Sequence, residues 1–588
     1  MLASARALRA SPSRLVLSAP RSASSRATLA RRSRAPLPSF AAGGRARLAC
    51  MASEAGASAP ETAGRRRARV AVIGAGAAGL AAARELTLEG HDAVVFEQGA
   101  ELGGVWVYDA DVEDDLTGAD ANRAKRVHSS VYASLRTNLP REVMGFASFP
   151  FTRAFTDDIR RFPGHAEVRA YLDAYADHHR IRNVVRLNTR VVSVTPIETS
   201  SASSASRDLE RWGPRWLVQT EPACVANEAS SKTDEDRSTD RSAFDAVVVC
   251  NGHYSEPRSP TIPGSDGWPG TQMHSHNYRT PEGDRFSFRG KTVVVLGAMA
   301  SGEDLSREIA SVAKHVTLAS RGFVTPSDAS RGDFPLDSYP ENMSRASGIV
   351  ALLPETSGVL FEDGSKTHDV DVVLYATGYH VTFPFFASFH EETFHEGEGS
   401  DDLVPRAFDN KVAPLFEHVF PPASAPSLSF IGLPWKVVPF PQFEAQARWI
   451  AKALSGASML PDRDEMASRA SKAERKDFED GVLDRHAHRM GDEQFAYNKR
   501  LYEYCREGDD ENDLLLTSLV WREAMYKATG LRKRAFPTSY RDGPAAPWSD
   551  EEALREARRE AAALGFESDS REKKSEKERS FSVGNAET

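Results

Sequence analysis

Two glycine-rich turns carry the residues of this chain best suited to chemistry, and both suit the binding of a dinucleotide. In the first, Gly74, Gly76 and Gly79 follow an apolar run at the spacing GxGxxG. The first glycine permits a tight turn, the second lets the backbone approach a pyrophosphate, and the third lets a helix pack closely. Glu97 ends the next apolar run, where a carboxylate can accept hydrogen bonds from ribose hydroxyls. The turn residues predicted to bind the dinucleotide are Gly74, Ala75, Gly76, Ala77, Ala78 and Gly79.

The second turn follows the apolar run from Lys291 to Leu296, and its chemistry differs. Met299 occupies the position of the middle glycine, and so bulky a side chain opposes a close approach of phosphate. The next apolar run ends in Ser320 and Arg321, where the alternative for Arg321 is an ordinary solvated strand end. Because a carboxylate suits a free ribose and an arginine suits a 2′-phosphate, the first site is predicted to bind FAD and the second NADPH. The second site comprises Gly297, Ala298, Met299, Ala300, Ser301, Gly302, Ser320 and Arg321.

Alternating strands and helices must position these turns. Val70 to Ile73 and Ala93 to Phe96 are short apolar runs typical of buried strands. Between them, residues 80–88 have helical spacing and good helix formers. The order of elements is a strand, a glycine turn, a helix, a second strand and an acid. This order predicts a parallel α/β fold far more specifically than the glycines alone. A pair of glycines, Gly103 and Gly104, follows the second strand. Such a pair lets the backbone lie close to the ribityl and ring end of the dinucleotide, so Gly104, Val105 and Trp106 are predicted to contact FAD.

Several stretches resemble motifs of the flavin-containing monooxygenases, and of their plant S-oxygenating branch in particular. Thr137-Asn138-Leu139-Pro140 is similar to the family's T-N-x-P stretch. Trp268 to Tyr278 resembles its FxGxxxHxxx(Y/F) signature, and Ala376 to Tyr379 resembles its ATGY link. The resemblance covers roughly residues 69–530. It implies two three-layer, Rossmann-like α/β domains, with an NADP domain inserted into a discontinuous FAD domain.

The resemblance also implies a role for Asn138. In the family an asparagine at this position lies over the flavin ring, so Asn138 is expected to be the catalytic residue, and Thr137 and Asn138 to contact FAD. An amide donates and accepts hydrogen bonds without titrating, so it can hold NADP⁺ and a peroxide together at any working pH. Without the resemblance, this stretch is a polar turn ended by Pro140, with Asn138 bonded to its own backbone.

The implied reaction is the NADPH-dependent oxygenation of a small molecule. NADPH reduces FAD, O₂ adds to form a C4a-hydroperoxyflavin, and a soft nucleophile, sulfur or nitrogen, attacks its distal oxygen. Because the flavin carries this chemistry, the chain needs no acid–base dyad or nucleophile triad. One alternative is a Baeyer–Villiger oxygenase, which usually has Trp where this chain has Tyr278. A disulfide reductase needs a flavin-facing dithiol, whereas a flavoprotein that senses NADPH without oxygenating needs only the same two turns.

Composition and charge argue against several other functions. The net charge is −9, so the chain has no overall excess of basic residues for binding nucleic acid. No apolar run is long enough to span a membrane. The four cysteines form no CxxC pair, which argues against a redox dithiol and a metal ribbon. His274 and His276 have no nearby Cys or acid to complete a metal site, so no metal is predicted.

The N-terminal segment differs from the rest in composition. Residues 1–50 contain ten Arg but no Lys, Asp or Glu, and Ser and Ala are abundant. That composition predicts an organelle transit peptide over residues 1–65, with a plastid favoured over a mitochondrion. The alternative is a cytoplasmic protein with a disordered extension.

The remaining chain is expected to divide at the motifs. The predicted segments are the first part of the FAD domain at 66–255, the NADP domain at 256–375, the second part of the FAD domain with C-terminal helices at 376–530, and an extension at 531–588. Two Ser- and acid-rich insertions, at about 199–208 and 227–242, cannot bury a core and are expected to be disordered. The end of the extension is expected to be disordered as well.

Overall fold

The computed structural model describes most of the chain from Arg66 onward. The described residues are 66–120, 122–123, 125–197, 215–223, 239–323, 339–386, 403–505 and 510–542, with Arg555 and Arg559. The predicted transit peptide, the insertion at 199–208, most of the insertion at 227–242 and the end of the extension lie outside them.

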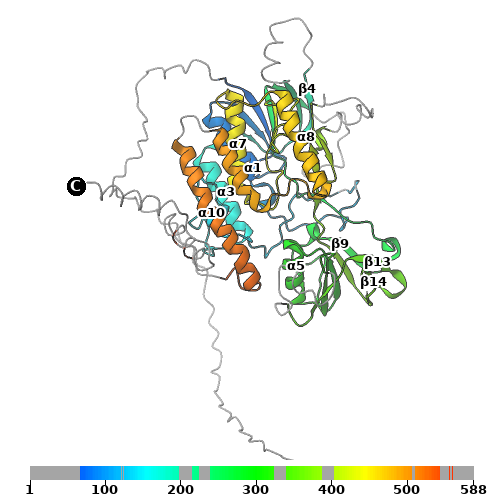
Figure 1. The fold of residues 1–588 in the computed structure, drawn as a ribbon. Coiled ribbons are helices and arrows are strands. Elements are labelled where there is room, and N and C mark those ends of the chain that lie inside the picture. Colours follow the sequence, from blue (N-terminus) through cyan, green and yellow to red (C-terminus); the bar gives the residue numbers. More distant parts are fainter. Residues whose placement is uncertain are drawn as a thin grey trace, which may run out of the picture. The chain divides into compact units, whose positions relative to one another are not determined.

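A five-stranded parallel sheet forms the centre of the first domain. Its strands, in the order β20-β7-β1-β2-β3, are β20 (Leu428–Phe430), β7 (Ala246–Val249), β1 (Arg69–Ile73), β2 (Asp92–Phe96) and β3 (Val185–Arg186). The helices packed on one face are α1 (Ala77–Leu88), α3 (His165–His178) and α7 (Pro439–Ser455), of which α1 and α7 run side by side (Figure 1). Val70, Val72 and Val95 contribute to this helical side of the core.

The opposite face of the same sheet packs on a second sheet. Because successive strand residues alternate between faces, Ala71, Ile73 and Phe96 point away from the helices. They share a core with Trp216 and Val218 of an antiparallel sheet. The strands of that sheet are β4 (Thr189–Pro196), β5 (Trp216–Pro222) and β6 (Asp240–Phe244). The first domain therefore has three layers.

The start of β6 corrects one prediction. The sequence predicts disorder through Ser242, but Asp240, Arg241 and Ser242 form the first part of β6 and pair with β5. β6 is an edge strand, so Asp240 and Arg241 point to water while the backbone supplies the hydrogen bonds. The composition of this segment does not predict a strand, because its polar residues bury no side chains. Backbone hydrogen bonds to β5 stabilise this part of β6 instead.

A second five-stranded parallel sheet forms the centre of another three-layer unit. Its strands, in the order β12-β11-β10-β16-β9, are β12 (Met343–Ala346), β11 (His315–Ala319), β10 (Thr292–Leu296), β16 (Val372–Tyr375) and β9 (Thr271–His274). α5 (Ala300–Ala310) buries Leu305 and Ile309 against one face. The other face packs on the antiparallel strands β13 (Ile349–Leu353), β14 (Gly358–Phe361) and β15 (Lys366–Thr367).

The second domain is inserted into the first. All strands of the second sheet lie between β7 and β20 in sequence, and the two segments where the chain crosses pair as β8 (Glu256–Pro257) and β17 (Tyr379–His380). The predicted fold class is therefore confirmed. The other named helices and strands are α2 (Arg141–Met144), β18 (Arg406–Phe408), β19 (Lys411–Ala413), α8 (Arg463–Glu479), α9 (Gln494–Tyr504) and α10 (Asp510–Ala535). Among the described helices, none is both long and apolar enough to cross a membrane.

Candidate active site

The first glycine turn is too tight to accommodate side chains at two positions. Gly74 has a φ of +101°, and a Cβ there would lie 2.6 Å from the carbonyl oxygen of Cys250. A Cβ on Gly79 would lie 1.9 Å from the carbonyl oxygen of Gly74. Both distances are far below van der Waals contact, so only glycine fits at either position. The turn thus brings the N-terminus of α1 directly against the end of β1.

The middle glycine lies beneath a second segment of the chain, and the tight position there is Gly104: a Cβ on Gly76 would meet the Cα of Gly104 at 3.5 Å, an ordinary contact. Gly76 caps α1 with a φ of −72°, which any residue can adopt, and no side chain caps the helix. Another segment crosses this position, because a Cβ on Gly104 would lie 2.9 Å from the Cα of Gly76. Gly104, Val105 and Trp106 form a short 3₁₀ helix, and the Trp106 ring packs edge-on against Phe440 with 6.4 Å between centroids. The first turn of α1 therefore faces backbone without intervening side chains, as a pyrophosphate site requires.

Glu97 stands beside this turn, as the sequence predicts. Its Oε2 accepts a hydrogen bond from the Ala75 N–H at 2.8 Å, and its Oε1 accepts one from the Gly99 N–H at 2.7 Å. These bonds fix the carboxylate and occupy only part of its roughly four lone-pair sites, so ribose hydroxyls can use the others. A glycine cradle with a fixed carboxylate fits FAD. The predicted residues that the structure gathers here are Gly74, Ala75, Gly76, Ala77, Ala78, Gly79, Glu97, Gly104, Val105 and Trp106.

Thr137, and not Asn138, bonds to the turn that carries both residues. The Thr137 hydroxyl donates to the carbonyl oxygen of Leu139 at 2.8 Å, and the Thr137 N–H donates to that of Pro163 at 2.9 Å. Asn138 is exposed, and its amide makes no hydrogen bond to any described residue. The structure therefore does not show an asparagine bonded to its own backbone. Neither side chain is hydrogen-bonded to the first glycine turn within the described residues, so their contact with FAD stays a prediction.

A buried arginine fixes the helix that follows this turn. α2 begins at Arg141, which is fully buried. Its guanidinium forms an ion pair with the buried Glu167 at 2.8 Å and donates to three carbonyl oxygens of the loop between α2 and α3. Removing one partner of such a pair costs about 3–5 kcal/mol, because the other is left buried without a counter-charge. No sequence pattern points to Arg141, since Glu167 lies on a different helix.

The second glycine turn repeats the geometry of the first. Gly297 has a φ of +114°, and a Cβ there would lie 2.4 Å from the carbonyl oxygen of Ala376. A Cβ on Gly302 would lie 1.7 Å from the carbonyl oxygen of Gly297. No side chain caps α5, so its N-terminus fits the phosphates of a dinucleotide. The predicted residues that surround this N-terminus are Gly297, Ala298, Met299, Ala300, Ser301 and Gly302.

Met299 fits the second turn with its side chain exposed. Its φ of −86° and ψ of −173° are close to the −72° and −175° of Gly76, so the two turns share one backbone shape. Gly104 presses on Gly76 in the first turn, whereas the Met299 side chain is 59% exposed. The backbone at this position thus suits methionine as well as glycine, and the exposed side chain makes no demand on a second segment. The substitution Met299→Gly tests whether the methionine weakens the binding of NADPH.

Ser320 and Arg321 follow β11 at the carboxyl edge of the second sheet. The Gly297 N–H donates to the carbonyl oxygen of Ala319 at 2.9 Å, so the second turn and the end of β11 lie side by side. The Ser320 N–H donates to the carbonyl oxygen of Ala346 at 3.1 Å, which fixes the strand end, and the Arg321 side chain is exposed. An exposed guanidinium beside a dinucleotide turn is placed to bind a 2′-phosphate.

We expect Arg321→Ala to raise the KM for NADPH by roughly tenfold or more, the factor that 1.4 kcal/mol represents. A guanidinium matches a phosphate bidentately, and charge-assisted hydrogen bonds contribute about 1.5–3 kcal/mol. NADH lacks the 2′-phosphate, so its KM should hardly change. Steady-state kinetics with both cofactors checks this. The control is Arg289→Ala, an exposed arginine of the same domain paired with Glu282. Equal losses with both cofactors would show that Arg321 only supports the fold.

An aromatic cluster surrounds Tyr379 at the crossing between the two domains. The rings of Tyr254, His274 and His276 lie 5.6, 5.3 and 5.8 Å from that of Tyr379. His274 and His276 are fully buried, and burial lowers their pKa values to about 3 and about 4. Both are therefore neutral at physiological pH and serve as packing groups. Over the part of the chain that the structure describes, no group of three His, Cys, Asp or Glu side chains could hold a metal ion.

Each of the two parallel sheets has an uncapped helix N-terminus at its carboxyl edge, one beside a glutamate and the other beside an arginine. This arrangement is typical of an oxidoreductase that binds two dinucleotide cofactors. The chain belongs to the flavin-binding monooxygenase-like family, which it matches over residues 67–338 and 343–517. It is therefore a flavin monooxygenase that binds FAD and NADP(H), and both predicted cofactors are confirmed.

Individual relatives place the chain near plant enzymes. It is 42% identical over 500 residues to flavin-containing monooxygenase FMO GS-OX-like 4 of Arabidopsis thaliana, covering 84% of this chain and 96% of that protein. It is 43% identical over 434 residues to FMO GS-OX5 of the same plant, covering 73% and 83%. The solved structure of S-allyl-L-cysteine S-oxygenase from Allium sativum gives a TM-score of 0.68 at 38% identity, covering 85% of this chain and 100% of that one. The predicted resemblance to the plant S-oxygenating branch is confirmed.

Proposed function

We propose that the protein uses NADPH and O₂ to oxygenate a soft nucleophile of a small molecule, with sulfur preferred over nitrogen. The observation that carries the proposal is the pair of dinucleotide turns, one beside Glu97 and one beside Arg321, in a chain of the flavin-binding monooxygenase-like family. The preference for sulfur is supported by the 38% identity to S-allyl-L-cysteine S-oxygenase, whose named substrate contains a thioether.

The chain's own residues bind the two dinucleotides, orient them and supply uncharged polar groups. When bound, FAD supplies the redox chemistry by accepting a hydride from NADPH and activating O₂ at its C4a carbon. Glu97 and the N-terminus of α1 hold one dinucleotide, and the N-terminus of α5 with Arg321 holds the other. Asn138 offers a donor and an acceptor that do not titrate. Because a thioether reacts through its lone pair and loses no proton, the substrate needs no general base.

Product analysis of the purified protein tests the proposal. With NADPH, O₂ and S-allyl-L-cysteine or methyl phenyl sulfide, we expect close to one sulfoxide per NADPH oxidised. A tertiary amine should give less N-oxide, and a cyclic ketone should give no lactone. Hydrogen peroxide in place of oxygenated product with every substrate would contradict oxygenation. Lactone as the main product would instead assign the enzyme to Baeyer–Villiger chemistry.

We further propose that residues 1–65 direct the protein to an organelle, with a plastid favoured. The support is the composition of residues 1–50, which carry ten Arg and no Lys, Asp or Glu. A fluorescent protein fused behind residues 1–65 should accumulate in plastids of a plant or algal cell. The matched control replaces the ten arginines by serine and should stay in the cytosol. A diffuse cytosolic signal from the unaltered fusion would contradict the proposal.

A further inference from the structure

A short segment after α10 folds back onto the rest of the chain. α10 ends at Ala535, and residues 536–542, which we name the C-terminal strap, begin with a turn in which the Tyr540 N–H donates to the carbonyl oxygen of Phe536 at 2.8 Å. Tyr540 is 2% exposed, and its ring packs edge-on against Phe162 with 5.6 Å between centroids. The C-terminal strap is thus anchored by a buried side chain.

Arg541 of the C-terminal strap bonds to two separate parts of the candidate site. Its two terminal nitrogens bind both carboxylate oxygens of Asp304, at 3.1 and 2.6 Å. Its Nε donates to the carbonyl oxygen of Thr137 at 3.1 Å. Asp304 lies on the second turn of α5, whose N-terminus is the proposed NADPH phosphate site. The Thr137 carbonyl shares one peptide plane with the N–H of Asn138. One guanidinium therefore joins the NADP helix to the peptide of the proposed catalytic residue.

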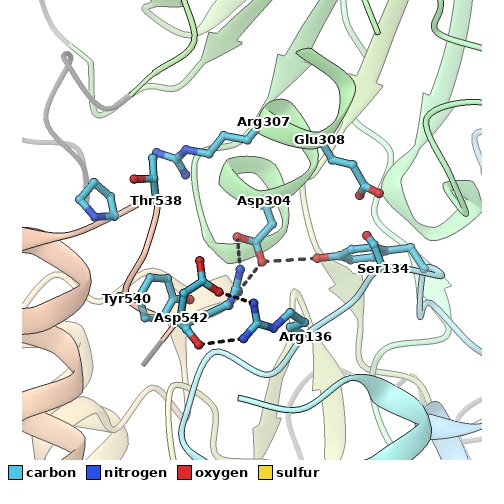
Figure 2. Close-up of a pocket in the computed structure, with 11 residues that line it drawn as sticks. Ser134, Arg136, Asp304, Arg307, Glu308, Thr538, Tyr540 and Asp542 are labelled. Atoms are coloured by element: carbon cyan, nitrogen blue, oxygen red, sulfur yellow. Dashed lines mark hydrogen bonds and ion pairs between the residues drawn. The ribbon is translucent and has the colours of Figure 1, made fainter. Parts of the chain in front are cut away.

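A second arginine holds the C-terminal strap from the other side. Arg136 binds the Asp542 carboxylate at 2.7 Å and donates to the carbonyl oxygen of Arg541 at 2.8 Å. Its Nε donates to the carbonyl oxygen of Phe162 at 3.0 Å. Figure 2 shows Arg136 facing Asp542 below the α5 residue Asp304. Because both the backbone and the neighbouring side chain are held, Arg541 is presented in one orientation.

A cavity of about 290 Å³ lies beside these contacts (Figure 2). The residues that line it from α5 and from the segment before Thr137 are Tyr132, Ser134, Arg136, Asp304, Arg307 and Glu308. Polar side chains border this open space, although Tyr132 packs in one apolar core with Leu305 and Ile309 of α5 and its hydroxyl lies 3.4 Å from Asp304. The guanidinium of Arg541 adds the directed hydrogen bonds that join α5 to the Thr137 carbonyl itself.

We propose that Arg541 is a positioning residue that fixes the Asn138 peptide relative to the NADP-binding helix. The inference rests on the proposed oxygenation, because it assigns Arg541 an effect on coupling. Reacting groups displaced by about 1 Å can lose on the order of a hundredfold in rate. Without Arg541, the Asn138 amide and bound NADP⁺ are no longer held in one geometry. The enzyme should then release more peroxide for each NADPH that it oxidises.

Coupling measurements on full-length variants test this role. Arg541→Ala should raise peroxide per NADPH by roughly tenfold over wild type, the scale that one lost charge-assisted hydrogen bond sets. Its FAD content and its KM for NADPH should change by less than about twofold. Asp304→Asn should act in the same direction, and the double variant should be no worse than the stronger single one, because both changes remove one shared contact. Arg534→Ala, an exposed arginine at the end of α10, is the control and should couple like wild type.

The possible outcomes separate the two proposals. A coupled wild type with unchanged coupling in Arg541→Ala overturns the positioning role and leaves the proposed function standing. A wild type that makes only peroxide overturns both. Should Arg541→Ala fail to fold, Arg541→Lys replaces it, because lysine keeps a charge beside Asp304 but lacks the planar Nε–H that holds the Thr137 carbonyl. Normal coupling in the folded lysine variant would equally overturn the role of Arg541.

Discussion

Asn138→Ala is expected to bind FAD and oxidise NADPH, yet to release hydrogen peroxide where wild type releases oxygenated product. The Thr137 hydroxyl and N–H hold the turn, and the Asn138 amide adds no hydrogen bond to it within the described residues. The substitution thus removes a donor and an acceptor without loosening the backbone. Peroxide per NADPH should approach one, because no amide then joins NADP⁺ to the oxygen that bound FAD activates.

Coupling and stability together decide the role of Asn138. The Tm of Asn138→Ala should stay within about 2 °C of wild type, since surface substitutions usually change stability by less than about 0.5 kcal/mol. Asn122→Ala, at an exposed asparagine elsewhere, is the matched control and should couple normally. If FAD content and Tm fall together while the surviving enzyme couples like wild type, Asn138 is a structural residue. A wild-type peroxide ratio in the FAD-loaded variant would likewise remove it from the mechanism.

Both dinucleotide turns could be predicted from the sequence because their constraints are local. Gly74 adopts a φ of +101° and Gly79 meets the carbonyl oxygen of Gly74, so both requirements arise within one strand–turn–helix unit and the spacing carries the geometry. The pattern does not say whether the middle position itself must be glycine. In the structure the tight position beside it is Gly104, where a Cβ would lie 2.9 Å from the Gly76 Cα, while the side chain of Met299 in the second turn is exposed.

Contacts between distant segments could not be predicted in this way. Arg541 lies 237 positions from Asp304, and neither residue belongs to a pattern that points to the other. Arg141 and Glu167 likewise meet only because the loop between α2 and α3 returns to the same place. Only the family resemblance points to Asn138, because the hydrogen bonds of its turn come from Thr137 and none within the described chain comes from the Asn138 amide.

Gly302→Ala should abolish most use of NADPH while leaving FAD bound. The new Cβ would lie 1.7 Å from the carbonyl oxygen of Gly297, and both atoms belong to the backbone frame, so no side-chain rotation can relieve the contact. Overpacking of this kind costs about 1–3 kcal/mol of folding stability and forces the backbone to shift. A shift here displaces the N–H groups at the N-terminus of α5, so the KM for NADPH should rise by roughly tenfold or more, as a loss of about 1.4 kcal/mol or more in binding implies. FAD should remain bound because the first domain has its own core. Flavin absorbance and the rate of NADPH oxidation measure the two effects.

Two further substitutions separate crowding at Gly302 from any general effect of changing the turn. Gly530→Ala makes the same change within α10, where a Cβ would meet nothing within 4 Å, and should leave NADPH kinetics unaltered. Met299→Gly restores the full GxGxxG spacing, yet it should change the KM for NADPH by less than about twofold, because glycine and methionine share the same allowed backbone conformation at this helix cap. A tenfold gain in affinity from Met299→Gly would show instead that the methionine side chain obstructs the phosphate.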